Sequence, residues 1–149
     1  MKLDNTIKNI KDLHPETVIL LEIGAFYHAY GKDAYILSYL FGYQIKSIEN
    51  TYNTCGAPKS AINKILSKLE EYKINYITII RSQNYEVDQE IKYKDKNNYN
   101  EIYEKAYKYT SLKNRINGIY NYLMENIDSP NIKSKIQMVE ESLFEAGKA

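Results

Sequence analysis

The feature that most constrains the fold is the apolar, β-branched run at residues 17–23, TVILLEI. β-branched residues favour strands, and a run without regular polar positions suits a strand buried inside a sheet. Gly24 breaks this run, and residues 25–30 (AFYHAY) then alternate as a second strand. Alternation divides its side chains between the two faces of the sheet, Phe26, His28 and Tyr30 on one and Tyr27 and Ala29 on the other.

Further elements are predicted on both sides of this strand pair. Helical spacing of apolar residues predicts a helix over residues 5–13, the residues before and after the segment (Asp33 and Gly42) predict one over residues 34–41, and helical spacing predicts another from Ser60 to about residue 71. Asp33 and Ser60 are suited to cap the last two, and a Cys-Gly-Ala-Pro turn is expected in the polar segment 49–58. Three more strands are predicted, at residues 43–48, 74–80 and 85–93. We therefore expect an α+β fold, a mixed β-sheet flanked by helices.

The pattern changes after residue 95. Residues 92–100 are rich in Lys and Asn, which is typical of a linker or an exposed loop. Apolar residues then recur at threes and fours from Ile102 to Leu123 and predict a helix of roughly 25 residues. Ser129-Pro130 is suited to open a last helix. We expect a domain at residues 1–95 and a C-terminal helical extension at 96–149, whose two helices pair with each other or with a partner.

Composition limits the sites that the chain can hold. Twenty basic and 19 acidic residues leave a formal net charge of +1, so any nucleic-acid binding must be local and sensitive to salt. One cysteine and two histidines cannot form an internal disulfide or, unaided, a structural zinc site. No cofactor is expected. A single cysteine fits a reducing cytoplasm, and no apolar run approaches the roughly 20 residues of a membrane span. We therefore expect a cytoplasmic protein that does not contact a membrane.

Tyrosine is unusually frequent, with 16 residues, while tryptophan is absent. We interpret this bias as the composition of an AT-rich genome rather than as a selected aromatic surface. Tyrosine can stack on nucleic-acid bases, but it is equally common as a half-buried residue of strands and helices.

Two motifs resemble the N-terminal mismatch-recognition domain, domain I, of the MutS family of DNA mismatch repair proteins. Residues 22–34, EIGAFYHAYGKDA, are similar to the family signature E-M-G-x-F-Y-E-x-[FY]-x-x-D-A. Residues 55–58, CGAP, are similar to the family's C-G-V-P and are likewise followed by a helix and a strand. The resemblance covers about residues 15–81. It implies a mixed β-sheet with surrounding helices and a recognition role without catalysis.

The resemblance also implies a DNA-binding site. In the family, a Phe-x-Glu pair enters the minor groove at a mispair, so Phe26 takes the position of the aromatic wedge. His28 stands where the family has glutamate, and its neutral ring can donate or accept one hydrogen bond. The candidate DNA-contacting residues are Phe26, Tyr27, His28, Lys46 and Lys59. Two alternatives remain: Phe26 as a core aromatic and the lysines as a solvated surface.

Two functions stay open at this point. The first is a non-enzymatic DNA-binding module that inserts Phe26 at a weakened base step and acts with a partner protein. The second is an accessory subunit that reuses the fold and docks through its C-terminal helices onto a nucleic-acid-processing enzyme; a homo-oligomer through these helices is also possible. The chain lacks the phosphate-loop pattern G-x-x-x-x-G-K-[ST], so it is not expected to run the family's ATP-driven cycle alone. Cys55 and His28 lack the third group of a catalytic triad, and no metal site is expected.

Overall fold

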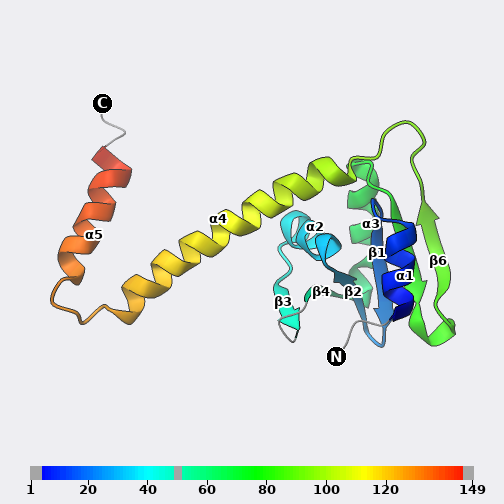
Figure 1. Cartoon of the computed structure of the whole chain (residues 1–149), viewed down its shortest axis with the longest axis horizontal. Coiled ribbons are helices and arrows are strands. Elements are labelled where there is room, and N and C mark those ends of the chain that lie inside the picture. Colours follow the sequence, from blue (N-terminus) through cyan, green and yellow to red (C-terminus); the bar gives the residue numbers. More distant parts are fainter. Residues whose placement is uncertain (1–4, 49–51, 146–149) are drawn as a thin grey trace. The chain divides into compact units, whose positions relative to one another are not determined.

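The computed structural model describes residues 5–48 and 52–145. The chain divides into two compact units, residues 1–110 and 111–149. Figure 1 labels most of the helices and strands, and each unit is considered by itself below. The boundary expected near residue 95 stays a prediction, because compactness alone does not show where an independently folding domain ends.

Unit 1 contains a six-stranded mixed sheet with the strand order β3-β4-β2-β1-β5-β6. β1 and β5 run parallel, and every other neighbouring pair runs antiparallel. The fold class expected from the sequence, an α+β mixed sheet with flanking helices and C-terminal helices, is therefore confirmed. The strands are β1 (Val18–Ile23), β2 (Phe26–Tyr30), β3 (Ile45–Ile48), β4 (Tyr52–Pro58), β5 (Tyr76–Ile80) and β6 (Glu86–Ile91).

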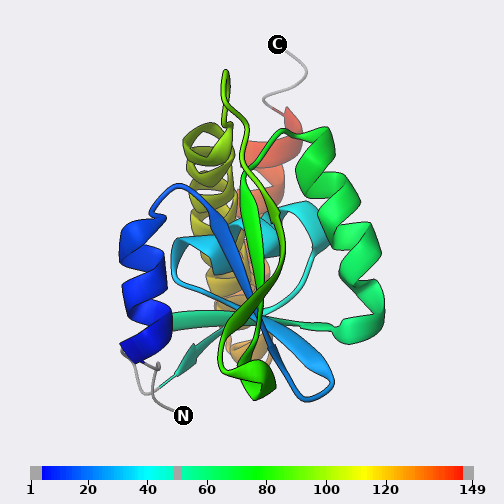
Figure 2. The same ribbon diagram turned by 90° about the vertical axis from the view of Figure 1, so that its right-hand side faces the viewer.

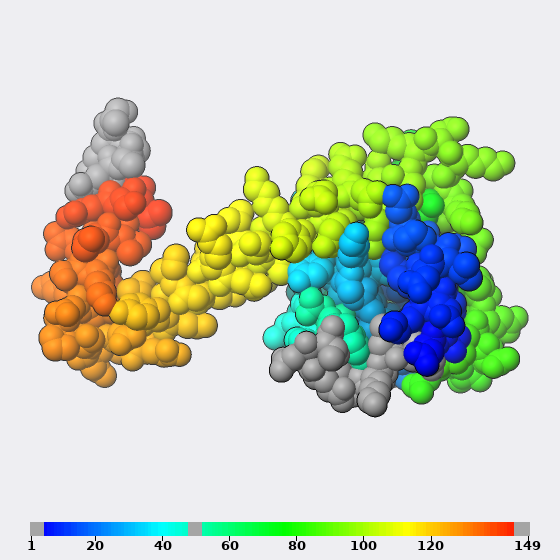
Figure 3. Space-filling model, in the orientation of Figure 1, coloured from blue at the N-terminus to red at the C-terminus, as the bar shows by residue number. Residues whose placement is uncertain are grey.

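Helices cover the sheet on both faces, as Figure 2 shows. On one face, α1 (Asn5–Leu13) packs Ile7 against a buried cluster of side chains from β1 and β5, namely Ile19, Leu21, Ile77 and Ile79. On the other face, α2 (Lys32–Phe41), α3 (Ile62–Glu71) and the beginning of α4 (Tyr99–Glu125) enclose the larger core. Because α1 packs over β1 and β5, the same face of β2 and β4 is less covered. In the space-filling view, α1 forms an exposed blue ridge on unit 1 (Figure 3).

The start of α4 belongs to the core of unit 1. Tyr99, Ile102 and Ala106 are all buried, and Tyr99 and Ile102 pack in the larger core. The preceding segment is held by hydrogen bonds: the Asn75 amide donates to Asn97 Oδ1 at 3.1 Å, and Asn98 Nδ2 donates to the Tyr72 carbonyl at 2.8 Å. Residues 92–98 are thus non-helical, as expected, but they are anchored to unit 1 at their end.

Unit 2 contains the rest of α4, then α5 (Ile132–Glu140) and a π-helical turn, η3 (Glu141–Glu145). Ile132 alone among its described residues is buried. The long helix expected from residue 102 onward is confirmed. The expected opening of the last helix at Ser129-Pro130 is wrong, since Asn131 occupies the cap position and the two residues before it form a turn.

Three other local expectations are wrong. Asp33 does not cap α2: Gly31 holds the cap position and makes no side-chain bond, while Asp33 lies buried in the first turn. Ser60 does not cap α3 either, because it lies inside a short 3-10 helix, η1 (Lys59–Ala61), and Ala61 precedes α3. Residues 55–58 are the second half of β4 rather than a turn. Part of the segment expected to be polar, residues 49–51, lies outside the described residues.

Candidate nucleic-acid interface

The turn between β1 and β2 presents Phe26. Gly24 has a φ of 60°, a left-handed conformation that favours glycine in a tight two-residue connection. The Lys59 amide donates to the Ala25 carbonyl at 2.8 Å and ties this turn to the end of β4. Phe26 follows as the first residue of β2, and half of its surface, 50%, is exposed. Phe26 is therefore not a core aromatic.

A row of aromatic rings leads from Phe26 along β2. The ring centroids of Phe26 and His28 are 6.5 Å apart, and those of His28 and Tyr30 are 6.4 Å apart. Tyr52, at the start of β4, continues the series with its ring 5.8 Å from that of Tyr30. We call Phe26, His28, Tyr30 and Tyr52 the aromatic row. Alternation along β2 thus brings together Phe26 and His28, as the sequence predicts. The packing of β4 against β2 adds Tyr52, which the sequence pattern does not predict.

His28 is neutral in this setting. Burial lowers the pKa of its imidazole below the ordinary value of 6.5, so the ring carries no charge at neutral pH. Its cross-strand neighbours are Leu21 on β1 and Gly56 on β4. A Cβ at Gly56 would lie 3.8 Å from the imidazole, and glycine leaves that side of the ring open. A neutral, half-buried imidazole can donate one hydrogen bond and accept another.

Tyr27 is placed away from the aromatic row. It points to the opposite face of the sheet, is 3% exposed and packs in the larger core. Burial also raises the pKa of its hydroxyl. Its side chain therefore packs inside the domain, next to Glu22 in the cross-strand register.

The two candidate lysines lie in different surroundings. Lys46 is exposed on β3 and pairs in register with Thr54, which in turn pairs with Tyr30, so Lys46 and Tyr30 share one face of the sheet. Lys59 forms an ion pair with Glu22, a carboxylate that is only 8% exposed. Since directly opposite residues in antiparallel strands face the same side, Lys46 belongs with the aromatic row. Lys59 instead holds the β1–β2 turn in place, through its ion pair with Glu22 and the hydrogen bond from its amide to Ala25.

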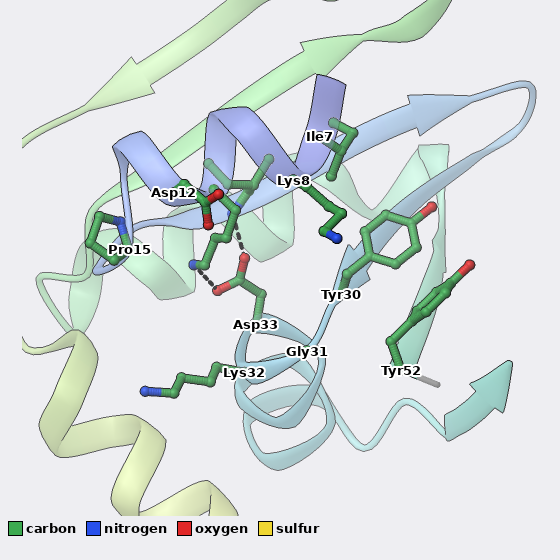
Figure 4. A pocket seen from close by; sticks show the side chains of 11 residues that line it. Ile7, Lys8, Asp12, Pro15, Tyr30, Gly31, Lys32, Asp33 and Tyr52 are labelled. Carbon is green, nitrogen blue, oxygen red and sulfur yellow. Dashed lines mark hydrogen bonds and ion pairs between the residues drawn. The ribbon is translucent and has the colours of Figure 1, made fainter. Parts of the chain in front are cut away.

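A hollow of about 440 Å³ opens at the end of the aromatic row (Figure 4). Tyr30 and Tyr52 form one side of it, Lys8 points in from α1, and Lys32 stands at the start of α2. Sequence reasoning missed these contributions, because α1, β4 and α2 meet here only in the folded chain. The remaining lining residues are Ile7, Lys11, Asp12, Pro15, Ile19, Gly31 and Asp33.

The floor of the hollow is a buried polar cluster around Asp33. The Lys11 ammonium donates to Asp33 Oδ1 at 2.7 Å, the Tyr99 hydroxyl donates to the same oxygen at 2.6 Å, and the Ile19 amide donates to Oδ2 at 3.0 Å. Burial raises the pKa of the Asp33 carboxyl, while these three donors oppose that rise. The cluster connects α1, β1, α2 and α4, and it holds the walls of the hollow in place.

The geometry offers no support for a Cys55–His28 pair. Cys55 lies opposite Ala29 in register, on the face of the sheet away from His28, and burial raises the pKa of its thiol to about 12. Within residues 5–48 and 52–145, no group of three or more His, Cys, Asp or Glu could hold a metal ion. No described helix is both long and apolar enough to cross a membrane.

Comparison with known proteins agrees with this geometry. The family model of MutS domain I matches residues 3–105, which is more than two thirds of the chain and includes the sheet, the aromatic row and the start of α4. None of the curated proteins matches the chain. MutS domain I is a DNA-binding recognition domain, and its fold is that of unit 1. The chain belongs to the MutS domain I family.

Proposed function

We propose that this protein is a DNA-binding module that inserts Phe26 at a weakened base step, with His28 beside it, and that it acts together with a partner. The observation that carries the proposal is the exposed ring of Phe26 at the β1–β2 turn, in the position of the family's wedge. Family membership supports DNA binding as such, and the wedge and the partner are the further steps proposed here.

The wedge acts through the cost of unstacking. An apolar ring inserted between base pairs costs a few kcal/mol of stacking, and a mispaired step has already lost part of that energy. Phe26 therefore enters most easily at a mispair or a distorted step. His28, the neighbouring ring 6.5 Å away, is neutral and can donate or accept a hydrogen bond at a displaced base. The family's glutamate only accepts when ionised, so this chain is expected to prefer a different set of mispairs.

Phe26→Ala is expected to remove the preference for mismatched duplex. We expect wild-type protein to bind a labelled duplex with one mispair more tightly than its matched homoduplex at low salt, where phosphate contacts are strongest. Loss of the ring should weaken binding to the mismatched duplex about 10- to 100-fold, in line with a wedge worth a few kcal/mol. Fluorescence anisotropy with a panel of mispairs measures both quantities.

The matched control is Leu13→Ala, which removes another exposed apolar side chain of unit 1. It should leave the preference unchanged. His28→Glu restores the family residue and should change which mispairs are preferred, while Phe26→Ala should abolish the preference for all of them. Equal binding of matched and mismatched duplex by the wild type would refute recognition through Phe26.

We propose further that the partner is a second copy of this chain, bound through unit 2. The α4 part of unit 2 carries Leu112, Ile116, Ile119 and Leu123 at spacings of four, three and four, a coiled-coil type seam. Ile116 is 64% exposed and Ile119 56% exposed. A hairpin of fewer than 40 residues with so small a core needs further burial to be stable.

Charge favours an antiparallel pair. In unit 2 the basic Lys113 and Arg115 precede the seam's centre, whereas the acidic Glu125, at the end of α4, and Asp128, in the turn after it, follow it. An antiparallel arrangement places the basic end of one copy beside the acidic end of the other, and a parallel arrangement places like charges together. Such a dimer would present two recognition domains to DNA.

The double variant Ile116→Glu/Ile119→Glu is expected to be monomeric, because it places charges in the apolar seam. Light scattering should give twice the mass of one chain for the wild type and a single chain for the variant. Asn114→Glu/Asn121→Glu is the matched control, since it adds the same charges on the opposite side of the helix and should remain dimeric. A monomeric wild type throughout the concentration range of the DNA titrations would refute the dimer.

A further inference from the structure

We infer that the aromatic row and the hollow at its end form a binding site for an unpaired nucleic-acid strand, adjacent to the duplex wedge. This inference rests on the proposed function as a DNA-binding module and adds a ligand, single-stranded DNA, and a path for it. Phe26 would lie at the junction with the duplex. His28, Tyr30 and Tyr52 would then contact successive unpaired bases.

The spacing of the rings selects an unstacked strand. Neighbouring rings are 5.8–6.5 Å apart along the whole row. Stacked bases in one strand of B-DNA rise by about 3.4 Å per nucleotide. The ring spacing therefore matches a strand that is stretched to nearly twice the rise per nucleotide of the duplex. The bases of such a strand no longer stack on one another, so they can stack on side chains instead. A sheet surface with interleaved aromatics is a common platform of this type.

The hollow has the size and lining to receive a base. Its volume of about 440 Å³ lies within the usual range of small-molecule sites, roughly 300–1,000 Å³. Tyr30 and Tyr52 meet there edge to face, with an interplanar angle of 63°. The base that contacts Tyr52 would enter the hollow here. Figure 4 shows both rings on the side of the hollow that Lys8 reaches from α1.

The charges beside this path suit phosphate groups. Lys8 lines the hollow and is exposed, and Lys46 lies on the same face of the sheet as Tyr30. Lys32 also lines the hollow, but its ammonium lies 4.9 Å from the centroid of the Tyr103 ring and points away from Tyr30 and Tyr52 (Figure 4). Lys11 is already paired with Asp33 and contributes no free charge. Asp12 is the other carboxylate of the lining and opposes phosphate binding locally. Two exposed lysines, Lys8 and Lys46, against one exposed aspartate still leave an excess of positive charge along the row.

Tyr52→Leu tests the stacking interaction. With a labelled single-stranded DNA oligonucleotide at low salt, we expect the variant to bind about 5- to 100-fold more weakly than the wild type, the usual effect of removing one aromatic ring from beneath a base. Tyr52→Phe keeps the ring and should bind as the wild type does. Tyr120→Leu is the matched control, an exposed tyrosine of unit 2 that should not change the affinity. Circular dichroism confirms that each variant is folded.

A salt titration tests the charges. Lys8→Gln/Lys46→Gln should flatten the dependence of the logarithm of affinity on the logarithm of salt by about 1.4, or about 0.7 for each phosphate of a single strand that is no longer neutralised. Unchanged affinity for Tyr52→Leu, or equal weakening by Tyr52→Phe, would overturn the stacking site. Tighter binding of an RNA of the same sequence than of the DNA would overturn the assignment to DNA.

The two proposals fail in different ways. If Tyr52→Leu leaves single-strand binding unchanged while Phe26→Ala still abolishes the mismatch preference, the wedge stands and the strand path does not. If single strands bind through Tyr52 while matched and mismatched duplexes bind equally, the strand path stands and the mismatch role does not.

Discussion

Asp33→Ala is expected to lower the free energy of unfolding by about 3–5 kcal/mol, the usual loss when one partner of a buried ion pair is removed. Asp33 is 1% exposed and accepts hydrogen bonds from Lys11, Tyr99 and the Ile19 amide. The substitution leaves the Ile19 amide of a central strand and the Tyr99 hydroxyl buried without this acceptor. Urea unfolding followed by circular dichroism measures the difference.

Two further variants separate charge from hydrogen bonding at this position. Asp33→Asn keeps an oxygen acceptor and should be less damaging than Asp33→Ala, although it leaves Lys11 without its counter-charge. Asp12→Ala is the matched control, because it removes an exposed carboxylate from the same hollow and should change stability by no more than about 0.5 kcal/mol. An Asp33→Ala protein within about 1 kcal/mol of the wild type would mean that the cluster is solvated and not structural.

The position of Asp33 shows where sequence reasoning ends. An aspartate directly before an apolar helical run fits a cap, and that local pattern is all that the sequence displays. Its actual partners, Lys11 and Tyr99, lie 22 and 66 residues away along the chain. The Asp33 carboxylate stabilises the domain more as the buried acceptor of the Ile19 amide than it would as a helix cap. Gly31 holds the cap position instead, and glycine costs little stability there.

The strands and helices themselves were predictable because burial is periodic. The exposed and buried residues of β2 alternate as its sequence alternates, and the apolar stripe of α3 is buried at Ile65, Leu66 and Leu69. Residues 55–58 were misjudged because Gly and Pro usually mark turns. In the structure Pro58 ends β4, where a strand tolerates proline, and Gly56 faces the ring of His28.

The candidate site was predictable only in its local part. Phe26 and His28 lie two residues apart on one strand, so alternation alone brings them together. Tyr52 and Lys8 join them through packing between distant segments, which no local pattern displays. Two of the tyrosines interpreted as compositional bias, Tyr30 and Tyr52, thus occupy defined positions in the aromatic row.

A chain ending at residue 95 is expected not to fold cooperatively, whereas a chain ending at residue 110 should unfold much like unit 1 of the full protein. The shorter chain lacks Tyr99 and Ile102, which are at most 4% exposed. Each such side chain contributes about 1.5–3 kcal/mol by burial, and Asp33 also loses the Tyr99 hydroxyl. The sum approaches the whole stability of a small domain, about 5–15 kcal/mol.

The chain ending at residue 110 keeps these side chains and the tyrosine pairs between α2 and α4, such as Tyr39 with Tyr109 at 5.5 Å. Comparison of the two truncations by urea unfolding therefore tests whether the first part of α4 is an integral part of the recognition domain. Ile102→Ala in the longer chain is the graded control and should cost about 2–5 kcal/mol. Cooperative unfolding of the shorter chain at the same midpoint would instead place the boundary near residue 95. In that case α4 would be an appendage from its first turn, and the aromatic row would stand on a domain that is complete without it.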